Sequence, residues 1–275
     1  MFLWKFFSPG KDRGEDVNNR NADNQTVLMD VAGQCSENHL SILKLLLEQP
    51  STEVNLADDK GNTALHVATN SKNIEAVKIL LADQRVDVNS KNSMKMTPLI
   101  IAAKEADNID ILKLLIAEPR VDVNCETANH MTALLTTALH PNIDAARLLL
   151  DDPRVDVNQM NGLGYTALHV AAHLKRKVKL LELFLAHPRV DVNCHLGQRH
   201  ETALHVAVAN NNVEGVKLIL AEPRLTSLEG QEGFEAVRIA VSEGNGDILK
   251  ELVYHQNIDL AVMDENGLGL DDLIR

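Results

Sequence analysis

Histidine is the residue in this sequence that most invites a chemical role, with 11 copies among 275 residues. Imidazole can ligate a metal or act as a general acid or base, usually together with cysteine or carboxylate side chains. The three cysteines (Cys35, Cys125 and Cys194) form no Cys-x-x-Cys pair, and no His-Glu-x-x-His motif is present. Adjacent carboxylates such as Asp58-Asp59 should diverge or be solvated. The sequence therefore predicts no catalytic residue, no metal site and no cofactor.

Composition and charge narrow the classes of protein and of partner. The hydrophobic fraction of 45% with only 3% aromatic residues predicts an aliphatic core. The net charge of −12 disfavours nucleic acid as a partner and would steer a basic protein surface towards the chain. No apolar run approaches the length of a transmembrane helix. Few cysteines, odd in number, favour a reducing compartment, so a cytoplasmic or nuclear location is expected.

A fixed internal period determines where the polar residues lie. The tripeptide Thr-x-Leu recurs with its threonines 34 to 37 residues apart, at Thr26, Thr63, Thr97, Thr132, Thr166 and Thr202. A second marker, Val-Asn, precedes each of these threonines by nine or ten residues. Two apolar stretches with helical spacing follow each threonine, as at 64–68 and 74–81. A threonine can cap the first helix, and one helix pair cannot bury its apolar face alone, so the units must stack.

The segments after the threonines carry a family signature. Thr63-Ala64-Leu65-His66-Val67-Ala68 resembles the ankyrin motif Thr-Pro-Leu-His-x-Ala, as do the segments that begin at Thr166 and Thr202. Thr97-Pro98-Leu99 supplies the proline form. The resemblance implies an all-α ankyrin-repeat solenoid of stacked helix-turn-helix units with projecting β-hairpin loops. It also implies that the signature histidines bond across neighbouring hairpin loops, so a structural role is expected for Thr63, His66, Thr97, Thr132, Thr166, His169, Thr202 and His205.

The two markers place the boundaries of the expected repeats. Residues 1–16 are interpreted as an aromatic segment and linker, and 17–275 as the repeat domain. The repeats are expected near 17–53, 54–87, 88–122, 123–156, 157–191, 192–225 and 226–259, with a partial cap at 260–275. Glu235 stands where the seventh repeat should have its threonine. Degenerate terminal repeats are what a solenoid needs to shield its core from water.

An arginine recurs once per repeat, followed two residues later by an aspartate in most cases. The arginines are Arg85, Arg120, Arg154, Arg189 and Arg224. One interpretation is a basic stripe for an acidic partner. The favoured interpretation is a surface ladder of alternating charge, because the aspartates would neutralise such a stripe locally.

The hairpin segments of the third to fifth repeats are the best candidates for a binding site. They span 90–96, 125–131 and 159–165 and hold four of the seven methionines. Methionine suits a surface that must adapt to a partner, and tyrosine is a common interface anchor. The candidate partner-binding residues are Met94, Lys95, Met96, His130, Met131, Met160, Leu163 and Tyr165. The alternative is that Met96, Met131 and Tyr165 pack against the neighbouring hairpin.

A second candidate lies at the N-terminus, where the sequence reads MFLWKFF. Phe2, Trp4, Phe6 and Phe7 are half of the aromatic residues of the chain. They could cap the exposed end of the first repeat. Otherwise they could dock on a partner or contact a membrane interface weakly.

These features favour a monomeric, non-enzymatic scaffold or adaptor that binds one or more proteins. An inhibitor of a transcription factor, similar to the kappa-B inhibitors, is a second hypothesis. Against it, the sequence has no Asp-Ser-Gly-type phosphodegron near its N-terminus and no acidic Pro/Ser-rich tail. A bacterial effector of ankyrin type is a third hypothesis. A membrane-associated adaptor that docks through Phe2, Trp4, Phe6 and Phe7 is a fourth.

Overall fold

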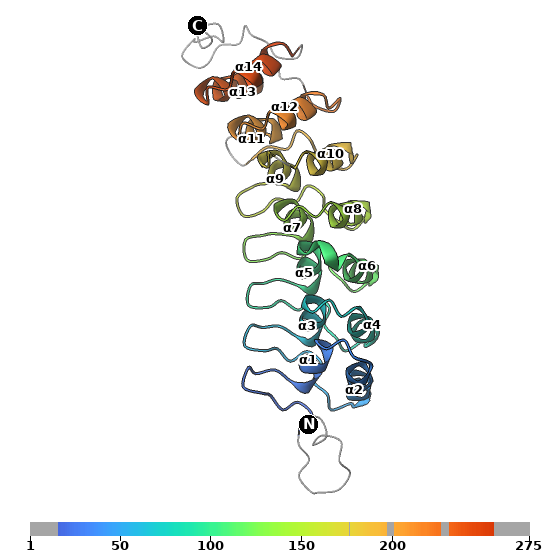
Figure 1. Ribbon diagram of the computed structural model, residues 1–275. Helices are drawn as coiled ribbons and strands as arrows, with labels where there is room; N and C mark the ends of the chain where they lie inside the picture. The colour runs from blue at the N-terminus through green and yellow to red at the C-terminus, as the bar shows by residue number, and fades with distance from the viewer. Residues whose placement is uncertain (1–15, 176, 197–200, 227–230, 256–275) are drawn as a thin grey trace, which may run out of the picture. The chain divides into compact units, whose positions relative to one another are not determined.

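The computed structural model describes residues 16–175, 177–196, 201–226 and 231–255. These residues form helices joined by loops and no β-strand (Figure 1). Two isolated β-bridges, Arg20 with Thr26 and Leu196 with Glu201, lie in the loops. The prediction of an all-α fold is therefore confirmed. The C-terminal cap predicted at 260–275 lies outside the described residues.

The chain divides into two compact units, unit 1 (Met1–Ala128) and unit 2 (Asn129–Arg275). The helices of unit 1 are α1 (Val27–Ala32), α2 (Glu37–Glu48), α3 (Ala64–Asn70), α4 (Ile74–Ala82), α5 (Pro98–Lys104), the 3-10 turn η2 (Ala106–Asn108) and α6 (Ile109–Ala117). Those of unit 2 are α7 (Ala133–Leu139), α8 (Ile143–Asp151), α9 (Ala167–His173), α10 (Val178–Ala186), α11 (Ala203–Ala209), α12 (Val213–Leu220), α13 (Gln231–Ser242) and α14 (Gly246–Val253).

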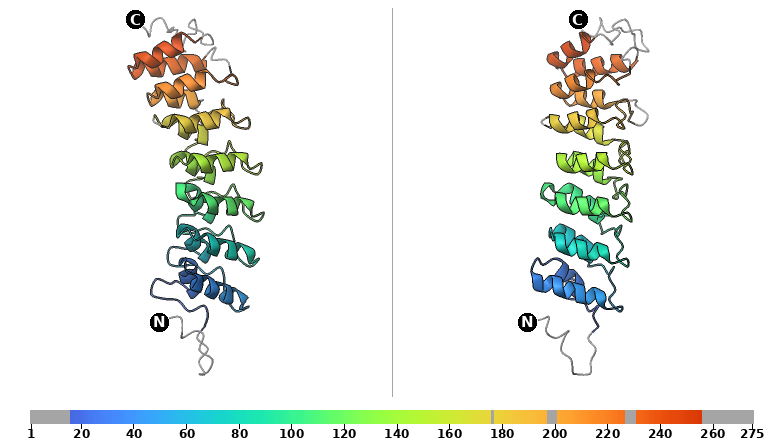
Figure 2. Two further views of the ribbon diagram at one scale, coloured as in Figure 1. Left: turned by 45° about the vertical axis from the view of Figure 1, so that its right-hand side comes forward. Right: turned by 90° about the vertical axis from the view of Figure 1, so that its right-hand side faces the viewer.

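Consecutive helices pack in pairs, and within each unit the pairs stack in layers (Figure 2). In unit 1 the first helices of the pairs, α1, α3 and α5, stack on one another, as do the second helices α2, α4 and α6. Unit 2 repeats this arrangement. We call the odd-numbered helices inner and the even-numbered helices outer. The hairpin loops project from the side of the inner helices (Figure 1).

The threonines of the Thr-x-Leu motif start the inner helices. From α1 to α11, each inner helix begins directly after one of these threonines. At α5 the Thr97 hydroxyl accepts a hydrogen bond from the backbone N–H of Ile100 (3.3 Å), and Pro98 occupies the first turn. A side-chain oxygen there satisfies a helix donor that would otherwise have no partner, and proline fits a position that needs no N–H. The motif therefore sets the start of each helix.

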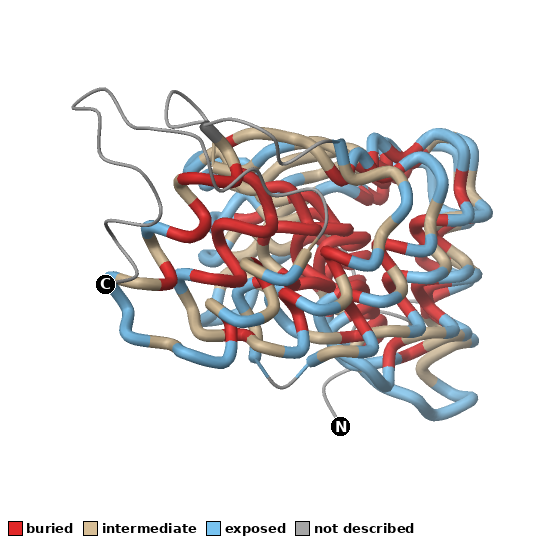
Figure 3. The backbone as a smooth tube through the Cα atoms, turned by 90° about the horizontal axis from the view of Figure 1, so that it is seen from above, coloured by how far each residue is buried: buried red, intermediate tan, exposed pale blue. Residues whose placement is uncertain are grey.

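The core is aliphatic, as the composition predicts. Ala68, Ala102 and Ala103 of the inner helices are fully buried, so neighbouring inner helices can approach closely. Leu80 and Leu112 of the outer helices α4 and α6 are fully buried as well. Figure 3 shows buried positions concentrated along the helices and exposed positions towards the loops. Burying such aliphatic side chains contributes about 1.5–3 kcal/mol each.

The asparagine of the Val-Asn marker joins one repeat to the next. Asn89 donates from Nδ2 to the carbonyl oxygen of Arg120 (2.8 Å) and accepts at Oδ1 from the backbone N–H of Asp122 (2.8 Å). Asn18, Asn55, Asn158 and Asn193 make the same pair of bonds one repeat onward. An amide carries both a donor and an acceptor, so one side chain satisfies two backbone groups. This explains why the marker is asparagine.

Among the described residues, Arg85, Arg120 and Arg189 form no ion pair with the aspartates that stand two residues after them, so the expected ladder of alternating charge is not built from these pairs. Arg120 instead bonds the carboxylate of Glu118, two residues before it (Nε–Oε1 2.9 Å). Its guanidinium also donates to the carbonyl oxygens of Leu81 (2.7 Å) and Val86 (3.1 Å) in the preceding repeat. Arg85 and Arg224 repeat this geometry within their units. The arginines therefore clamp the carboxyl ends of the outer helices, where the helix dipole favours a cation.

Candidate functional site

In four of the described hairpin loops, one side chain accepts hydrogen bonds within the loop. In the loop 90–96, Oδ1 of Asn92 accepts from the backbone N–H groups of Met94 and Met96 (both 3.0 Å). The backbone N–H of Asn92 in turn donates to the carbonyl oxygen of Met96 (3.0 Å). Asn21, Asp58 and Asn161 do the same in their loops. Such Asx turns fix the conformation of a loop without β-strands.

Neighbouring loops of one unit are also bonded to each other. In unit 1 the backbone N–H of Ser93 donates to the carbonyl oxygen of Lys60 (2.9 Å). In unit 2 the corresponding bond joins Gly162 to Asn129 (3.0 Å). Gly61 lies at the close approach in unit 1, with a positive φ of 74°, and a Cβ there would lie 2.7 Å from the backbone nitrogen of Ser93. These backbone bonds and the close approach at Gly61 therefore hold the loop tips in fixed conformations.

The structure separates the predicted binding residues into two groups. Met94, Met160 and Leu163 are exposed, with 64%, 39% and 80% of their surface accessible. Lys95 and His130 are exposed as well.

Met96, Met131 and Tyr165 are only half-exposed and contact the scaffold. The Tyr165 ring meets the His169 ring edge-on (centroids 6.1 Å apart), and Nδ2 of Asn161 lies 3.7 Å from Sδ of Met131. Met131 therefore contacts the neighbouring hairpin, whereas Tyr165 packs on the inner helix of its own repeat.

Lys95 and His130 have a backbone conformation that their residue types do not favour. Their φ angles are 58° and 55°, in the left-handed region. The equivalent position in other loops holds Asn24, Gly61 or Gly164. A side chain other than glycine costs roughly 1–2 kcal/mol there, and asparagine tolerates the region best. Since the backbone does not require lysine or histidine, their side chains are candidates for a functional role.

The signature histidines lie under the loops and are part of the scaffold. The backbone N–H of Thr63 donates to Nδ1 of His66 (3.2 Å), so Nε2 carries the proton and bonds the carbonyl oxygen of Met96 (3.0 Å). His205 repeats this with Thr202 and Glu232. Burial lowers the pKa of His66 and of His205, and it lowers the pKa of His169 to about 4. These imidazoles are therefore neutral near pH 7.

A cavity of about 350 Å³ lies between the hairpin loops and the inner helices of unit 1. Met94 and Met96 line it from the loop, and Val67 and Ile101 line it from α3 and α5. The polar residues that line it include Asp58, Lys60, His66, Lys104 and Glu105. The exposed Met94 is therefore part of the lining of this cavity.

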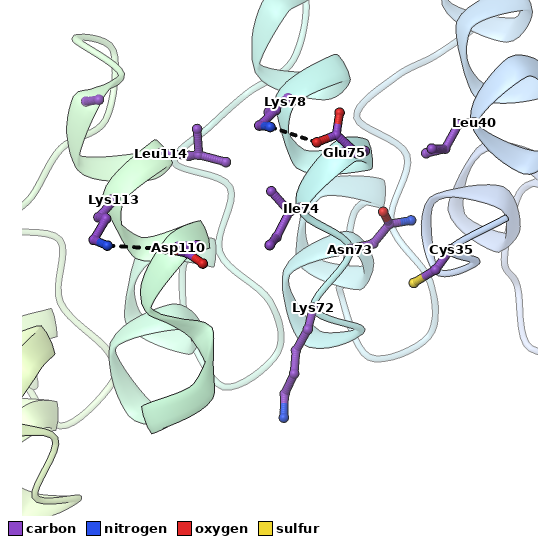
Figure 4. Close-up of a pocket in the computed structure, with 11 residues that line it drawn as sticks. Cys35, Leu40, Lys72, Asn73, Ile74, Glu75, Lys78, Asp110, Lys113 and Leu114 are labelled. Atoms are coloured by element: carbon purple, nitrogen blue, oxygen red, sulfur yellow. Dashed lines mark hydrogen bonds and ion pairs between the residues drawn. The ribbon is translucent and has the colours of Figure 1, made fainter. Parts of the chain in front are cut away.

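A larger groove of about 780 Å³ lies on the outer helices of unit 1 (Figure 4). Leu40, Ile74 and Leu114 line it, and lysines at its rim are paired, as Lys78 is with Glu75 (2.7 Å) and Lys113 with Asp110 (3.2 Å). Sequence reasoning missed this groove, because Ile74 and Leu114 follow the same helical spacing as buried core residues.

The described residues contain neither a metal site nor a helix that could cross a membrane. No group of three or more His, Cys, Asp or Glu side chains in them is arranged to hold a metal ion. No helix in the described part of the chain is long and apolar enough to cross a membrane. The N-terminal candidates Phe2, Trp4, Phe6 and Phe7 lie outside the described residues.

Comparison with known proteins identifies the repeat unit. The family model for ankyrin repeats (3 copies) matches residues 5–92, 99–195 and 168–264. A search among curated proteins found no match.

Among solved structures, the ankyrin-repeat protein EF0377 aligns with a TM-score of 0.63 and 26% identity, over 71% of this chain and 96% of that one. An ankyrin-repeat domain from Acinetobacter baumannii AYE (ABAYE2397) aligns at 0.61 and 27%, over 71% and 96%. The ankyrin-repeat domain of Bcl-3, a member of the IkappaB protein family, aligns at 0.69 and 23%, over 79% and 96%.

The matched segments cover most of the sequence, and the structural neighbours share its stacked helix pairs and projecting loops. Ankyrin repeats form protein-interaction domains and in general are not enzymes. The chain belongs to the ankyrin-repeat family.

Proposed function

We propose that the chain is a non-enzymatic scaffold or adaptor that binds a partner protein through its hairpin loops. The observation that carries this proposal is the exposure of Met94 and Leu163 on loops whose backbone is fixed by hydrogen bonds. A rigid loop loses little conformational entropy on binding, so an apolar side chain that it holds in water is a suitable anchor. Contiguous exposed apolar surface is typical of interaction sites, a criterion that applies to each unit by itself.

The remaining candidates take different parts in this proposal. Met160 extends the apolar surface beside Leu163, because both lie in the uncharged loop 159–165. Lys95 and His130 supply polar contacts from the strained positions of their loops. Met96, Met131 and Tyr165 stabilise the loops from below and would affect binding indirectly.

The test is affinity purification with mass spectrometry on the tagged chain. Met94→Ser with Leu163→Ser removes one anchor from each unit. The matched control, Leu45→Ser with Leu139→Ser, removes two leucines of 46% and 53% exposure from helices α2 and α7, away from the loops. Circular dichroism checks that both variants are folded.

We expect partners that the wild type and the control capture to be lost with the loop variant. Partners that persist with the loop variant and disappear with the control would place the binding surface on the helices.

The transcription-factor and membrane hypotheses have separate tests. The likeness to Bcl-3, at 23% identity, is a likeness of fold, so an inhibitor of a transcription factor needs evidence from the partner itself. A membrane-associated adaptor would depend on Phe2, Trp4, Phe6 and Phe7. Binding of the intact chain to liposomes, abolished by deletion of residues 1–7, would support it.

A further inference from the structure

The cavity beside Met94 carries lysines that form no ion pair among the described residues. Lys60 and Lys104 line the cavity, and Lys95 lies in the same loop as Met94. None of these three lysines forms an ion pair with another described residue. A lysine without a local counter-ion is available to an anionic group of a partner.

Lysines on the outer helices of unit 1 are arranged differently. Lys78 and Lys113 each lie beside a carboxylate, and Lys72, just before α4, is paired with Asp107. Lys44 of α2 is the exception, since it forms no ion pair with another described residue. The difference is therefore between Lys60, Lys95 and Lys104, which have no ion pair, and Lys72, Lys78 and Lys113, which have one.

The acidic residues of the cavity offset only part of this charge. The Asp58 carboxylate accepts hydrogen bonds from the backbone N–H groups of Lys60 (2.9 Å) and Asn62 (2.8 Å), so it is engaged within its loop. Glu105 is exposed at the rim. The loop 90–96 adds Lys91 and Lys95 and no acid. The cavity and this loop together hold four lysines against two carboxylates, with His66 neutral.

Four of the residues that line the same cavity are apolar. Met94 and Met96 on the loop face Val67 and Ile101 of the inner helices across it. Methionine side chains adapt to the shape of the group they contact. An apolar side chain that enters here would lie beside Lys60 and Lys104, with Lys95 in the adjoining loop.

We propose that this cavity binds an acidic peptide segment of the partner, with one apolar side chain between Met94 and Ile101. Aspartate or glutamate residues flanking that side chain face Lys60, Lys95 and Lys104. This inference rests on the proposed function and specifies the chemistry of the partner. It reverses the partner charge that the net −12 suggests. Beyond a Debye length of about 8–10 Å charges are largely screened, so groups within the cavity decide the contact.

The experiment is a selection of displayed random peptides on the immobilised full chain. The pocket variant is Lys60→Glu with Lys95→Glu and Lys104→Glu. The control variant, Lys44→Glu with Lys78→Glu and Lys113→Glu, makes the same change in net charge on the outer helices. Circular dichroism verifies that both are folded. Enriched peptides are then synthesised, and their affinity is measured by fluorescence anisotropy at low and at high salt.

We expect the enriched peptides to combine Asp or Glu with Leu, Ile or Phe. The pocket variant should bind them roughly tenfold more weakly or worse, because each reversal replaces an attraction with a repulsion. Affinity should also fall with added salt, and the control variant should bind like the wild type.

Three results would overturn the proposal: enrichment of basic or uncharged peptides, no enrichment at all, or enriched peptides that bind the pocket and control variants equally. Peptides that depend on Met94 but carry no acidic residue would overturn the partner chemistry alone and leave the proposed function standing. Peptides indifferent to both Met94→Ser and the lysine reversals would count against both.

Discussion

Asn73 offers the sharpest test of how the repeats are held together, and Asn73→Ala is the perturbation. Its Oδ1 accepts from the backbone N–H of Ala76 (3.2 Å), which caps helix α4. Its Nδ2 donates to the carbonyl oxygens of Ala32 (3.0 Å) and Gln34 (2.8 Å) at the end of α1 in the preceding repeat. The side chain is buried, so water cannot replace these bonds freely.

The magnitude follows from these three bonds. Loss of an asparagine N-cap costs about 1 kcal/mol. A hydrogen bond lost from a buried backbone carbonyl costs roughly another 1–3 kcal/mol. The Ala32 carbonyl belongs to a buried residue, whereas Gln34 is exposed and its carbonyl can bond to water. We therefore expect Asn73→Ala to lower the free energy of unfolding by about 2–3 kcal/mol.

The assay is urea denaturation followed by circular dichroism, with amide hydrogen exchange to localise the effect. Because the stability of stacked repeats is a sum of repeat and interface terms, exchange should accelerate most in α1 and α2. Asn70→Ala is the control, since Asn70 is exposed at the end of α3 and should change stability by no more than about 0.5 kcal/mol. Equal effects of the two substitutions would refute the reasoning.

Three further predictions concern the other repeated contacts. Arg120→Met should lower the free energy of unfolding by about 1–3 kcal/mol, because the carbonyl oxygens of Leu81 and Val86 lose a charged donor. An unchanged midpoint of urea denaturation would contradict a stabilising role of these Arg120 contacts. Lys95→Gly should stabilise the chain by up to about 1 kcal/mol, because glycine tolerates the positive φ. It should also weaken the binding of any partner that depends on the loop. A loss of stability in thermal melts would contradict the prediction of strain at Lys95. His169 has a folded-state pKa of about 4, below its unfolded value. The unfolded state therefore binds the proton first, so stability is full above about pH 6.5 and falls by about 3 kcal/mol as pH drops towards 4. His169→Leu, the residue type found at Leu135, should remove only the part of the pH profile that comes from His169, because burial also lowers the pKa of His66 and of His205. An unchanged profile would exclude His169 as a source.

The fold followed from features that are local in the sequence. The spacing of Thr97 from Thr63, and the apolar pattern behind each, predict capped helices in a stack. Both signals act over a few residues, because an N-cap and a helical face are short-range properties. The candidate loops were found in the same way, since Met94 and Leu163 interrupt segments that should be polar.

The pairing of polar side chains was not predictable. Sequence proximity suggested that each arginine pairs with the aspartate after it, but Arg85 bonds Asp83 before it and the backbone of the preceding repeat. The partners of Asn89 and Asn73 include groups 31 to 41 residues away. No feature of the neighbouring sequence distinguishes Asn73 and Asn89 from asparagines that are exposed to solvent.

Residue type and short spacing were enough to specify the period, the helix starts and the loops that could bind. Only the stacking of the helix pairs settled that Met94 is exposed while Met96 is half-buried, and that Lys60 and Lys104 share a cavity. Residues one repeat apart in the chain become neighbours when the pairs stack, and no local pattern encodes how closely they approach. Stacking geometry therefore fixes which charges remain unpaired and which side chains water still reaches.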